Sequence, residues 1–229
     1  MWNNFLFQNL AGNGTDLEPE LNDTWRSIHY RNYIGQMQRA IVEDGVNVVA
    51  YTAWSLMDNF EWASGYYERF GVNWVNFTDP ERPVYRKESS SYYQELARRN
   101  NVESSDEAPK SLPDKCYYNA ERDEFTGGEF PADFKWSLAT AAYQIEGSHE
   151  AEGKGENIWD KFSNAQNVGG VEGKCNVANC ETGNNACESY TNTERDIQLI
   201  KDMGIKVIFF VKMLNIMEKQ CSINFFKQF

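Results

Sequence analysis

Basic residues are scarce in this chain. Its 229 residues include 22 lysines and arginines against 34 aspartates and glutamates, which gives a formal net charge of -12. Nucleic acids and anionic membranes attract proteins through clustered lysine and arginine, so the composition argues against both as partners. A neutral ligand remains compatible with this charge.

Long apolar runs are also missing. The most apolar late stretch, residues 205–217, is interrupted by Lys206 and Lys212 and is too short to cross a bilayer. The first residues, MWNNFLFQNLAGNG, lack the basic start and the long apolar core of a secretion signal. We therefore expect no membrane segment in this chain, which either enters the export route as part of a longer protein or is cytoplasmic.

The cysteines lack the spacing of a metal site. Cys175, Cys180 and Cys187 lie close together, but no histidine stands beside them and the intervals are not those of a zinc knuckle. We predict no metal site and no cofactor, and the short interval favours a loop disulfide between Cys175 and Cys180. The sequence leaves open the oxidation state of all five cysteines: Cys116, Cys175, Cys180, Cys187 and Cys221.

Three Asn-X-Thr triplets, or sequons, begin at Asn13, Asn22 and Asn76. A sequon is the acceptor for N-linked sugar in secreted proteins, although single triplets are common by chance. Together they favour a secreted or extracellular setting, with this chain as part of a longer protein.

The most informative stretch, residues 46–62, reads VNVVAYTAWSLMDNFEW. Its first seven residues are apolar and rich in β-branched side chains, a pattern typical of a strand buried on both faces. Two indoles and two acids follow the strand: Trp54, Asp58, Glu61 and Trp62. Flat rings cover the C–H faces of a sugar and carboxylates accept hydrogen bonds from its hydroxyls, so the pattern suits a sugar site. The alternative is a tryptophan-rich corner of the core with solvated acids.

This stretch carries a family resemblance. The segments WSLMDNFEW (54–62), GY (65–66) and RFG (69–71) resemble the carboxyl-terminal signature of the family 1 glycoside hydrolases, which are (β/α)8-barrel β-glycosidases. The resemblance implies that Trp54 stacks on the non-reducing sugar, that Glu61 holds its outer hydroxyls and that Trp62 lines the same pocket. A β-glycoside or another sugar is the ligand it implies.

A second signature of the same family follows. Residues 130–147, FPADFKWSLATAAYQIEG, and 153–160, GKGENIWD, resemble the amino-terminal part of the family. Residues 136–143 are small and apolar, as in a tightly packed inner strand, and Gln144 is the first long polar side chain after them. An amide offers a donor and an acceptor, which suits a pair of sugar hydroxyls. The resemblance makes Gln144 such a contact, and the alternative is a glutamine that satisfies loop backbone.

The two catalytic carboxylates of the family have no match. The family nucleophile belongs to a Thr-Glu-Asn-Gly segment, and here Gly12 stands in the place of that glutamate, while the Asn-Glu-Pro acid/base segment is absent. Glu18 and Glu20 lie beyond the Asn-Gly pair in a proline-containing loop, so neither is assigned the role. We predict no catalytic residue and no turnover by this chain alone. The alternatives are a non-catalytic sugar-binding remnant and a gene-model remnant without function.

The order of the two signatures is inverted. We expect residues 1–99 to be the end of one family module, 100–128 an acidic linker, 129–207 the start of a second module and 208–229 an unmatched tail. Because a whole barrel needs ~250 residues, the predicted fold is α/β, a partial (β/α)8 barrel whose last and first βα units are joined by the linker. The first and eighth strands of a barrel are neighbours, so the two signatures are predicted to pair and to bring the four sugar contacts together.

Apolar periodicity predicts the other elements. We expect a helix over 24–43, capped by Asn22 or Asp23 and stopped by Gly45. Its apolar face contains Ile28, Tyr33, Ile34, Met37, Ala40 and Ile41. Further helices are expected over 89–98 and 188–203, a further strand over 205–211, and a hairpin strand over 70–77.

Overall fold

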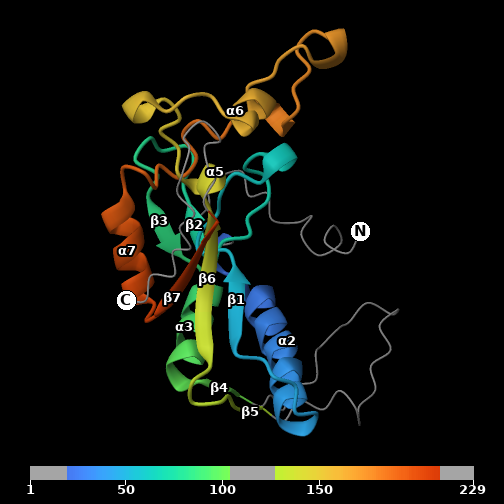
Figure 1. Cartoon of the computed structure of the whole chain (residues 1–229), viewed down its shortest axis with the longest axis vertical. Coiled ribbons are helices and arrows are strands. Elements are labelled where there is room, and N and C mark those ends of the chain that lie inside the picture. The colour runs from blue at the N-terminus through green and yellow to red at the C-terminus, as the bar shows by residue number, and fades with distance from the viewer. Residues whose placement is uncertain (1–19, 104–126, 212–229) are drawn as a thin grey trace, which may run out of the picture.

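The computed structural model describes residues 20–103 and 127–211 (Figure 1). The predictions for Gly12, Asn13 and Glu18, for most of the linker with Cys116, and for residues 212–229 of the unmatched tail, with Cys221, fall outside these residues. The structure therefore does not bear on them.

Three parallel strands form the central sheet, in the order β1 (Ala50–Trp54), β6 (Lys135–Ala141), β7 (Val207–Val211). Tyr51 pairs with Trp136 in the register between the first two strands. The pairing predicted between the strand before Trp54 and the strand before Gln144 is confirmed. Residues 20–103 and 127–211 thus share one α/β sheet, with β6 at its centre.

β1 differs from the prediction in length and in burial. The strand begins at Ala50, and the valines at positions 46 and 49 are 46% and 64% exposed. Along the strand only Ala53 is buried, while Thr52 and Trp54 are exposed. The prediction of a strand buried on both faces is wrong, because β1 has a single pairing neighbour among the described residues and lies at the edge of the sheet.

Helix α2 (Thr24–Glu43) packs beside β1 with the predicted bounds (Figure 1). Ile34 is fully buried, but Ile28 is 39% and Tyr33 is 67% exposed, so these two were placed on the wrong face. Tyr30, one turn before Ile34, takes the buried position instead and contacts Tyr93. The buried stripe is therefore rotated from the predicted one.

The start of α2 is held in an unexpected way. Asp23 is the N-cap residue, yet its side chain makes no capping bond within the helix. Its carboxylate instead accepts hydrogen bonds from the backbone and hydroxyl of Ser89, at 2.8 and 2.6 Å, and from Nε of Arg26 at 2.9 Å. The carboxylate thus joins the starts of two helices. Gly45, with φ of 66°, follows the helix end as predicted.

The remaining elements surround the sheet or close its ends. They are β2 (Asn73–Val75), β3 (Val84–Arg86), α3 (Glu88–Arg99), β4 (Asn101–Val102), β5 (Gly128–Glu129), α5 (Ala142–Ile145), α6 (Ile158–Ser163) and α7 (Thr193–Asp202), with short 3-10 turns at Trp62–Ser64, Ala151–Gly153, Val168–Gly170 and Ala178–Cys180. α7 begins five residues later than predicted. Glu188, where the helix was expected to start, has a left-handed φ of 52° that an α-helix does not accommodate.

The two sides of the predicted linker meet below the sheet. β4 and β5 pair antiparallel, and the side chain of Asn100 donates to the Phe130 carbonyl at 3.0 Å. Nε1 of Trp136 in turn donates to Oδ1 of Asn100 at 2.9 Å. The residues on either side of 104–126 are therefore tied to each other and to β6.

One apolar core joins the two described ranges. Ile34, Leu56 and Tyr93 from the first range pack in the same cluster as Leu138 and Ile208 from the second. The predicted disulfide between Cys175 and Cys180 is confirmed, and Cys187 is a buried free thiol. In the part of the chain that the structure describes, no helix has the length and apolar character needed to cross a membrane.

Candidate functional site

The carboxyl ends of the parallel neighbours β1 and β6 lie at the same end of the sheet (Figure 1). The four predicted sugar contacts belong to these two strand ends. Trp54 is the last residue of β1, and Glu61 and Trp62 lie in the loop that follows it. Gln144 lies in the one-turn helix α5, directly after β6. Because the two strands are parallel neighbours, both loops leave the sheet at the same end.

Trp54 positions the carboxylate of Glu61. Its Nε1 donates to Oε1 of Glu61 at 3.2 Å, across seven residues of loop. The Trp54 side chain is nevertheless 37% exposed, so part of its ring is open to solvent. A flat apolar surface next to a held carboxylate can contact both the C–H face and a hydroxyl of one sugar ring.

Gln144 joins the two loops. It is 2% exposed, and its Nε2 donates to Oδ1 of Asn59 and to the Phe60 carbonyl, each at 2.8 Å. The Phe60 amide returns a hydrogen bond to the Gln144 carbonyl at 3.0 Å. Gln144 thus satisfies loop backbone, as its alternative interpretation stated, and its amide nitrogen is engaged by the chain itself.

Glu61 ionises near neutral pH. Burial raises the pKa of its carboxyl to about 7, against the opposing effect of hydrogen bonds from Trp54 and Gln144. The negative charges of Glu68 and Asp58 raise this pKa further. Near pH 7 the group is therefore present in both forms, one that accepts from a hydroxyl and one that can also donate.

Trp62 packs against the aromatic side chains of the second range. Its ring stacks on Tyr143 with an interplanar angle of 7° and a centroid distance of 6.3 Å. The Trp159 ring lies closer, at 4.1 Å and 42°. Trp62 is half-buried, so the chain itself covers part of the indole that was predicted to line the sugar pocket.

A buried ion pair supports the loop from below. Asp58 is fully buried and accepts from Nζ of Lys87 at 2.8 Å and from the Gly71 amide at 3.0 Å. Nη1 of Arg69 lies 3.4 Å from its other oxygen. Burial lowers the pKa of Lys87, and the negative charge of Asp58 opposes this. The ion pair therefore fixes the loop between β1 and Glu61 against Lys87 and the segment around Gly71.

Asn59 and Lys87 are residues of the site to which the sequence analysis assigned no role. Asn59 donates to Oγ of Ser55 and to the Met57 carbonyl, each at 3.0 Å, and presents its own oxygen to Gln144. It lies inside the family signature, which could have indicated it. No sequence motif indicates Lys87. It lies 29 residues after Asp58, and a lysine is usually exposed to solvent.

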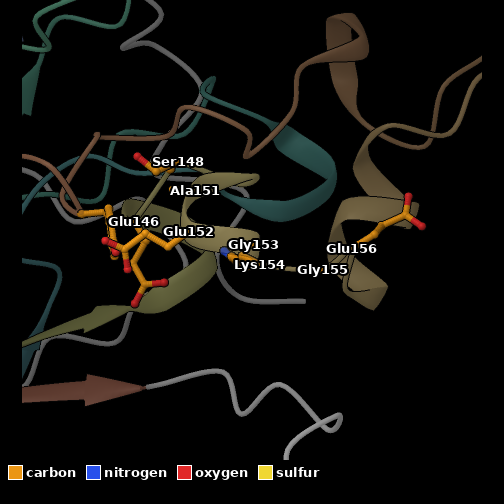
Figure 2. Close-up of a pocket in the computed structure, with 10 residues that line it drawn as sticks. Glu146, Ser148, Ala151, Glu152, Gly153, Lys154, Gly155 and Glu156 are labelled. Carbon is orange, nitrogen blue, oxygen red and sulfur yellow. The ribbon is translucent and has the colours of Figure 1, made fainter.

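A separate cavity of about 720 Å³ is hollowed beside the loop after α5 (Figure 2). None of the four predicted residues lines it. Its lining consists of Glu146, Gly147, Ser148, Ala151, Glu152, Gly153, Lys154, Gly155, Glu156 and Tyr190. A hydrogen bond to Glu152 and the nearby charge of Glu146 raise the pKa of the Tyr190 phenol. Figure 2 shows Glu156 apart from these two acids.

Over residues 20–103 and 127–211, no group of three or more histidine, cysteine, aspartate or glutamate side chains is arranged to hold a metal ion. The acids at the sheet end are instead bound by lysine, arginine, indole and amide donors. Of these acids Asp58 is fully buried, so Glu61 is the one placed to accept a hydrogen bond from a neutral polar ligand.

Comparison with known proteins gives one family. The model of "Glycosyl hydrolase family 1" matches residues 3–102 and 126–212, so the second match extends past the module boundary predicted at 207. The chain is 37% identical over 197 residues to lactase/phlorizin hydrolase of Rattus norvegicus. This alignment covers 86% of this chain and 9% of the relative. It is 48% identical over 77 residues to beta-glucosidase A of Acetivibrio thermocellus, covering 34% of this chain and 15% of that protein.

Solved structures of similar sequence cover a smaller share. A family 1 β-glucosidase from the fungus Humicola insolens, in complex with glucose, is 43% identical with a TM-score of 0.35. The match covers 37% of this chain and 17% of that one. The chain thus spans about a tenth to a fifth of the length of the relatives it matches.

Proposed function

Because the chain belongs to glycosyl hydrolase family 1, we propose that the carboxyl ends of β1 and β6 form the sugar-holding part of a β-glycosidase site. Four residues make the contacts in this proposal: Trp54, Glu61, Trp62 and Gln144. The expected ligand is the non-reducing sugar of a β-glycoside. We propose that this chain alone binds such a sugar and does not hydrolyse it.

The fold in this proposal is part of a (β/α)8 barrel. β1 is its eighth strand, β6 its first and β7 its second, which agrees with their parallel order. In such barrels the active site lies at the carboxyl ends of the strands, where Trp54 and Gln144 lie. The free edges of β1 and β7, among the described residues, are the edges that further barrel strands would extend.

Each residue has its own role in the proposed site. Trp54 supplies the exposed indole face for the C–H surface of the sugar, and Glu61 binds hydroxyls at the edge of that ring. Gln144 adds an acceptor and fixes the loop, and Trp62 closes the side toward Tyr143. The observation that best supports this proposal is the hydrogen bond of 3.2 Å from Trp54 to Glu61. It places the flat indole ring beside the carboxylate.

The proposed absence of turnover rests on two segments that the sequence lacks. Retaining glycosidases need two carboxylates about 5–5.5 Å apart, one as nucleophile and one as acid/base. Neither a Thr-Glu-Asn-Gly nor an Asn-Glu-Pro segment occurs in the 229 residues. Without a positioned nucleophile and a tuned acid, the oxocarbenium-like transition state has no partner. In a longer protein that supplies both, the same contacts would serve hydrolysis.

We further propose that the chain joins the end of one family module to the start of the next. Support comes from the alignment of 197 residues with the rat relative, since this length must run through both described ranges. The interval between the two family matches, residues 103–125, lies within the linker predicted at 100–128.

Sugar binding is the direct test. Intrinsic tryptophan fluorescence of the 229-residue chain should change in a saturable way as methyl β-D-glucoside is added, because Trp54 lies in the proposed site. Trp54→Ala should abolish the change and Glu61→Gln should weaken binding about tenfold, the equivalent of ~1.4 kcal/mol for a lost charged hydrogen bond. The exposed Glu172→Gln serves as the matched control and should bind like the parent chain.

Hydrolysis is measured on the same samples with an aryl β-glucoside. We expect no release above background at any pH between 5 and 8. A measurable hydrolysis rate that is lost when one particular aspartate or glutamate is replaced would contradict the proposal. Such a result would reveal a catalytic carboxylate.

A further inference from the structure

We propose that Asn76 and Asn22 are N-glycosylated, each carrying an oligosaccharide linked through N-acetylglucosamine. This inference concerns the two sequons that lie within the described residues and does not depend on the sugar site. It rests on the secreted setting, and on the geometry of each asparagine in the folded chain.

Asn76 presents its side chain at the end of β2. Its Oδ1 accepts from the Thr78 amide at 3.0 Å and from the Thr78 hydroxyl at 2.7 Å. Its backbone amide donates to the Pro83 carbonyl at 3.0 Å, which keeps the turn against β3. The carbonyl side of the amide is therefore held by the sequon threonine, and the nitrogen is directed away from it.

Asn76 is half-buried, and its side-chain nitrogen keeps some contact with solvent. Within the described chain Nδ2 donates to no group, and it is not among the buried polar atoms that lack a partner. A sugar linked to this atom would displace no hydrogen bond among the described residues. The packing of the sequon's middle residue is also undisturbed, since Phe77 lies against Tyr66 at a centroid distance of 4.3 Å.

Asn22 is held in a similar way at the start of α2. It is exposed, and its Oδ1 accepts from the Thr24 hydroxyl at 2.6 Å. The same hydroxyl contacts Oε2 of Glu88 at 2.5 Å, which fixes the threonine on the surface. The middle residue, Asp23, is 2% exposed and its carboxylate is bound to Ser89 and Arg26. The turn thus buries its middle side chain and leaves the asparagine outside.

The disulfide supports the compartment in which this reaction takes place. Cys175 and Cys180 are linked, and such bonds form and persist in secreted and lumenal proteins. There the donor is a lipid pyrophosphate-linked oligosaccharide. A bond forms between Nδ2 and C1 of the terminal N-acetylglucosamine, the bond from C1 to the pyrophosphate oxygen breaks, and the amide releases one proton while the lipid pyrophosphate leaves.

The experiment uses the full 229-residue chain behind a cleavable secretion signal in cultured animal cells. Asn13 is replaced by Gln throughout, so that only the two proposed sites contribute. Peptide mass spectrometry after enzymatic deglycosylation in ¹⁸O-water measures the glycosylated fraction of each asparagine separately. Both the secreted chain and the chain retained inside the secretory pathway are analysed. Asn76→Gln and Thr78→Ala should each remove one glycan, whereas Thr78→Ser should keep it, and the same series applies to Asn22 and Thr24.

Asn179→Gln is the matched control, because Asn179 is exposed but lies outside any sequon, and it should leave both glycans in place. The glycosylated chain is expected to elute outside the aggregate fraction in gel filtration, with the same melting midpoint before and after deglycosylation. Unmodified Asn22 and Asn76 in signal-cleaved chain would overturn the inference, and so would glycans confined to aggregated material. Neither result would affect sugar binding by the bacterially made chain, so the two proposals fail separately.

Discussion

Two acidic loops at the same end of the sheet differ in what holds their carboxylates. In the loop after β1, Asp58 and Lys87 form an ion pair of 2.8 Å with side chains 0% and 2% exposed. In the loop that lines the cavity, Glu156 and Lys161 lie 3.8 Å apart and are 58% and 69% exposed. An exposed pair contributes little, because water screens the charges, whereas a buried carboxylate must keep its partner.

The difference shows how an acid-rich loop becomes a positioned site. In the first loop, donors from distant parts of the chain bury and bind the acids, so Glu61 is held beside Trp54. In the second loop, acids line a cavity, where Glu152 is bound by the Tyr190 phenol and Glu156 lies near an exposed lysine. Acidic composition alone does not separate these two cases.

Replacing the buried lysine is expected to have the largest effect on stability and so to test the difference between the two loops most strongly. Lys87→Met should lower the free energy of unfolding by about 3–5 kcal/mol, because Asp58 would stay buried with only Arg69 and an amide as partners. Lys161→Met removes the exposed partner and should cost less than about 1 kcal/mol. Urea denaturation monitored by circular dichroism measures both. Equal losses would show that burial does not distinguish the two pairs.

A smaller effect is expected from the amide that joins the loops. Gln144→Leu would leave Oδ1 of Asn59 and the Phe60 carbonyl without their donor and should cost about 1–3 kcal/mol. Gln166→Leu makes the same replacement at an exposed position and should change stability by less than about 0.5 kcal/mol. If the two variants unfold at the same urea concentration, Gln144 does not hold the loop.

The smallest effect concerns pH. The pKa of Glu61 is raised to about 7 in the folded chain, so the folded state binds more protons than the unfolded state between about pH 4.5 and 7. The contribution of Glu61 to stability should therefore be greatest below this window and fall as pH rises through it, by about 1–2 kcal/mol once the partial exposure of Glu61 is allowed for.

Glu61→Gln isolates this contribution. The variant should lose this part of the pH dependence, whereas Glu156→Gln in the cavity loop should keep it. Unfolding curves at several pH values between 4 and 8 compare the three chains. A parent chain that gains stability over the same window relative to Glu61→Gln would contradict the raised pKa.

Much of the sheet could be predicted because its signals are local. The apolar runs before Trp54 and Gln144 indicated two strands, and barrel geometry indicated that they are neighbours. What failed depended on tertiary surroundings. The burial of β1 was overestimated because a sequence does not reveal that a strand lies at the edge of a sheet, and the face of α2 was misplaced because Tyr30 competes with Tyr33 for the core.

The site itself was predictable only in part. Family resemblance indicated Trp54, Glu61, Trp62 and Gln144, and the structure places them at one end of neighbouring strands. The family resemblance could not indicate that the Gln144 amide nitrogen donates to Asn59 and Phe60. Nor could it indicate Lys87, whose role arises from burial beside Asp58 and not from any motif. Contacts between distant residues are where a single sequence carries least information.

Indole signals give the most direct test of the shared sugar site. A two-dimensional NMR spectrum resolves the N–H of each tryptophan, and methyl β-D-glucoside can be added stepwise to the isotope-labelled chain. The account predicts that the Trp54 and Trp62 signals move with one common binding curve, while Trp74 and Trp136, which are 2% and 6% exposed, stay in place. Signals that do not move, or that move equally for all four indoles, would contradict it.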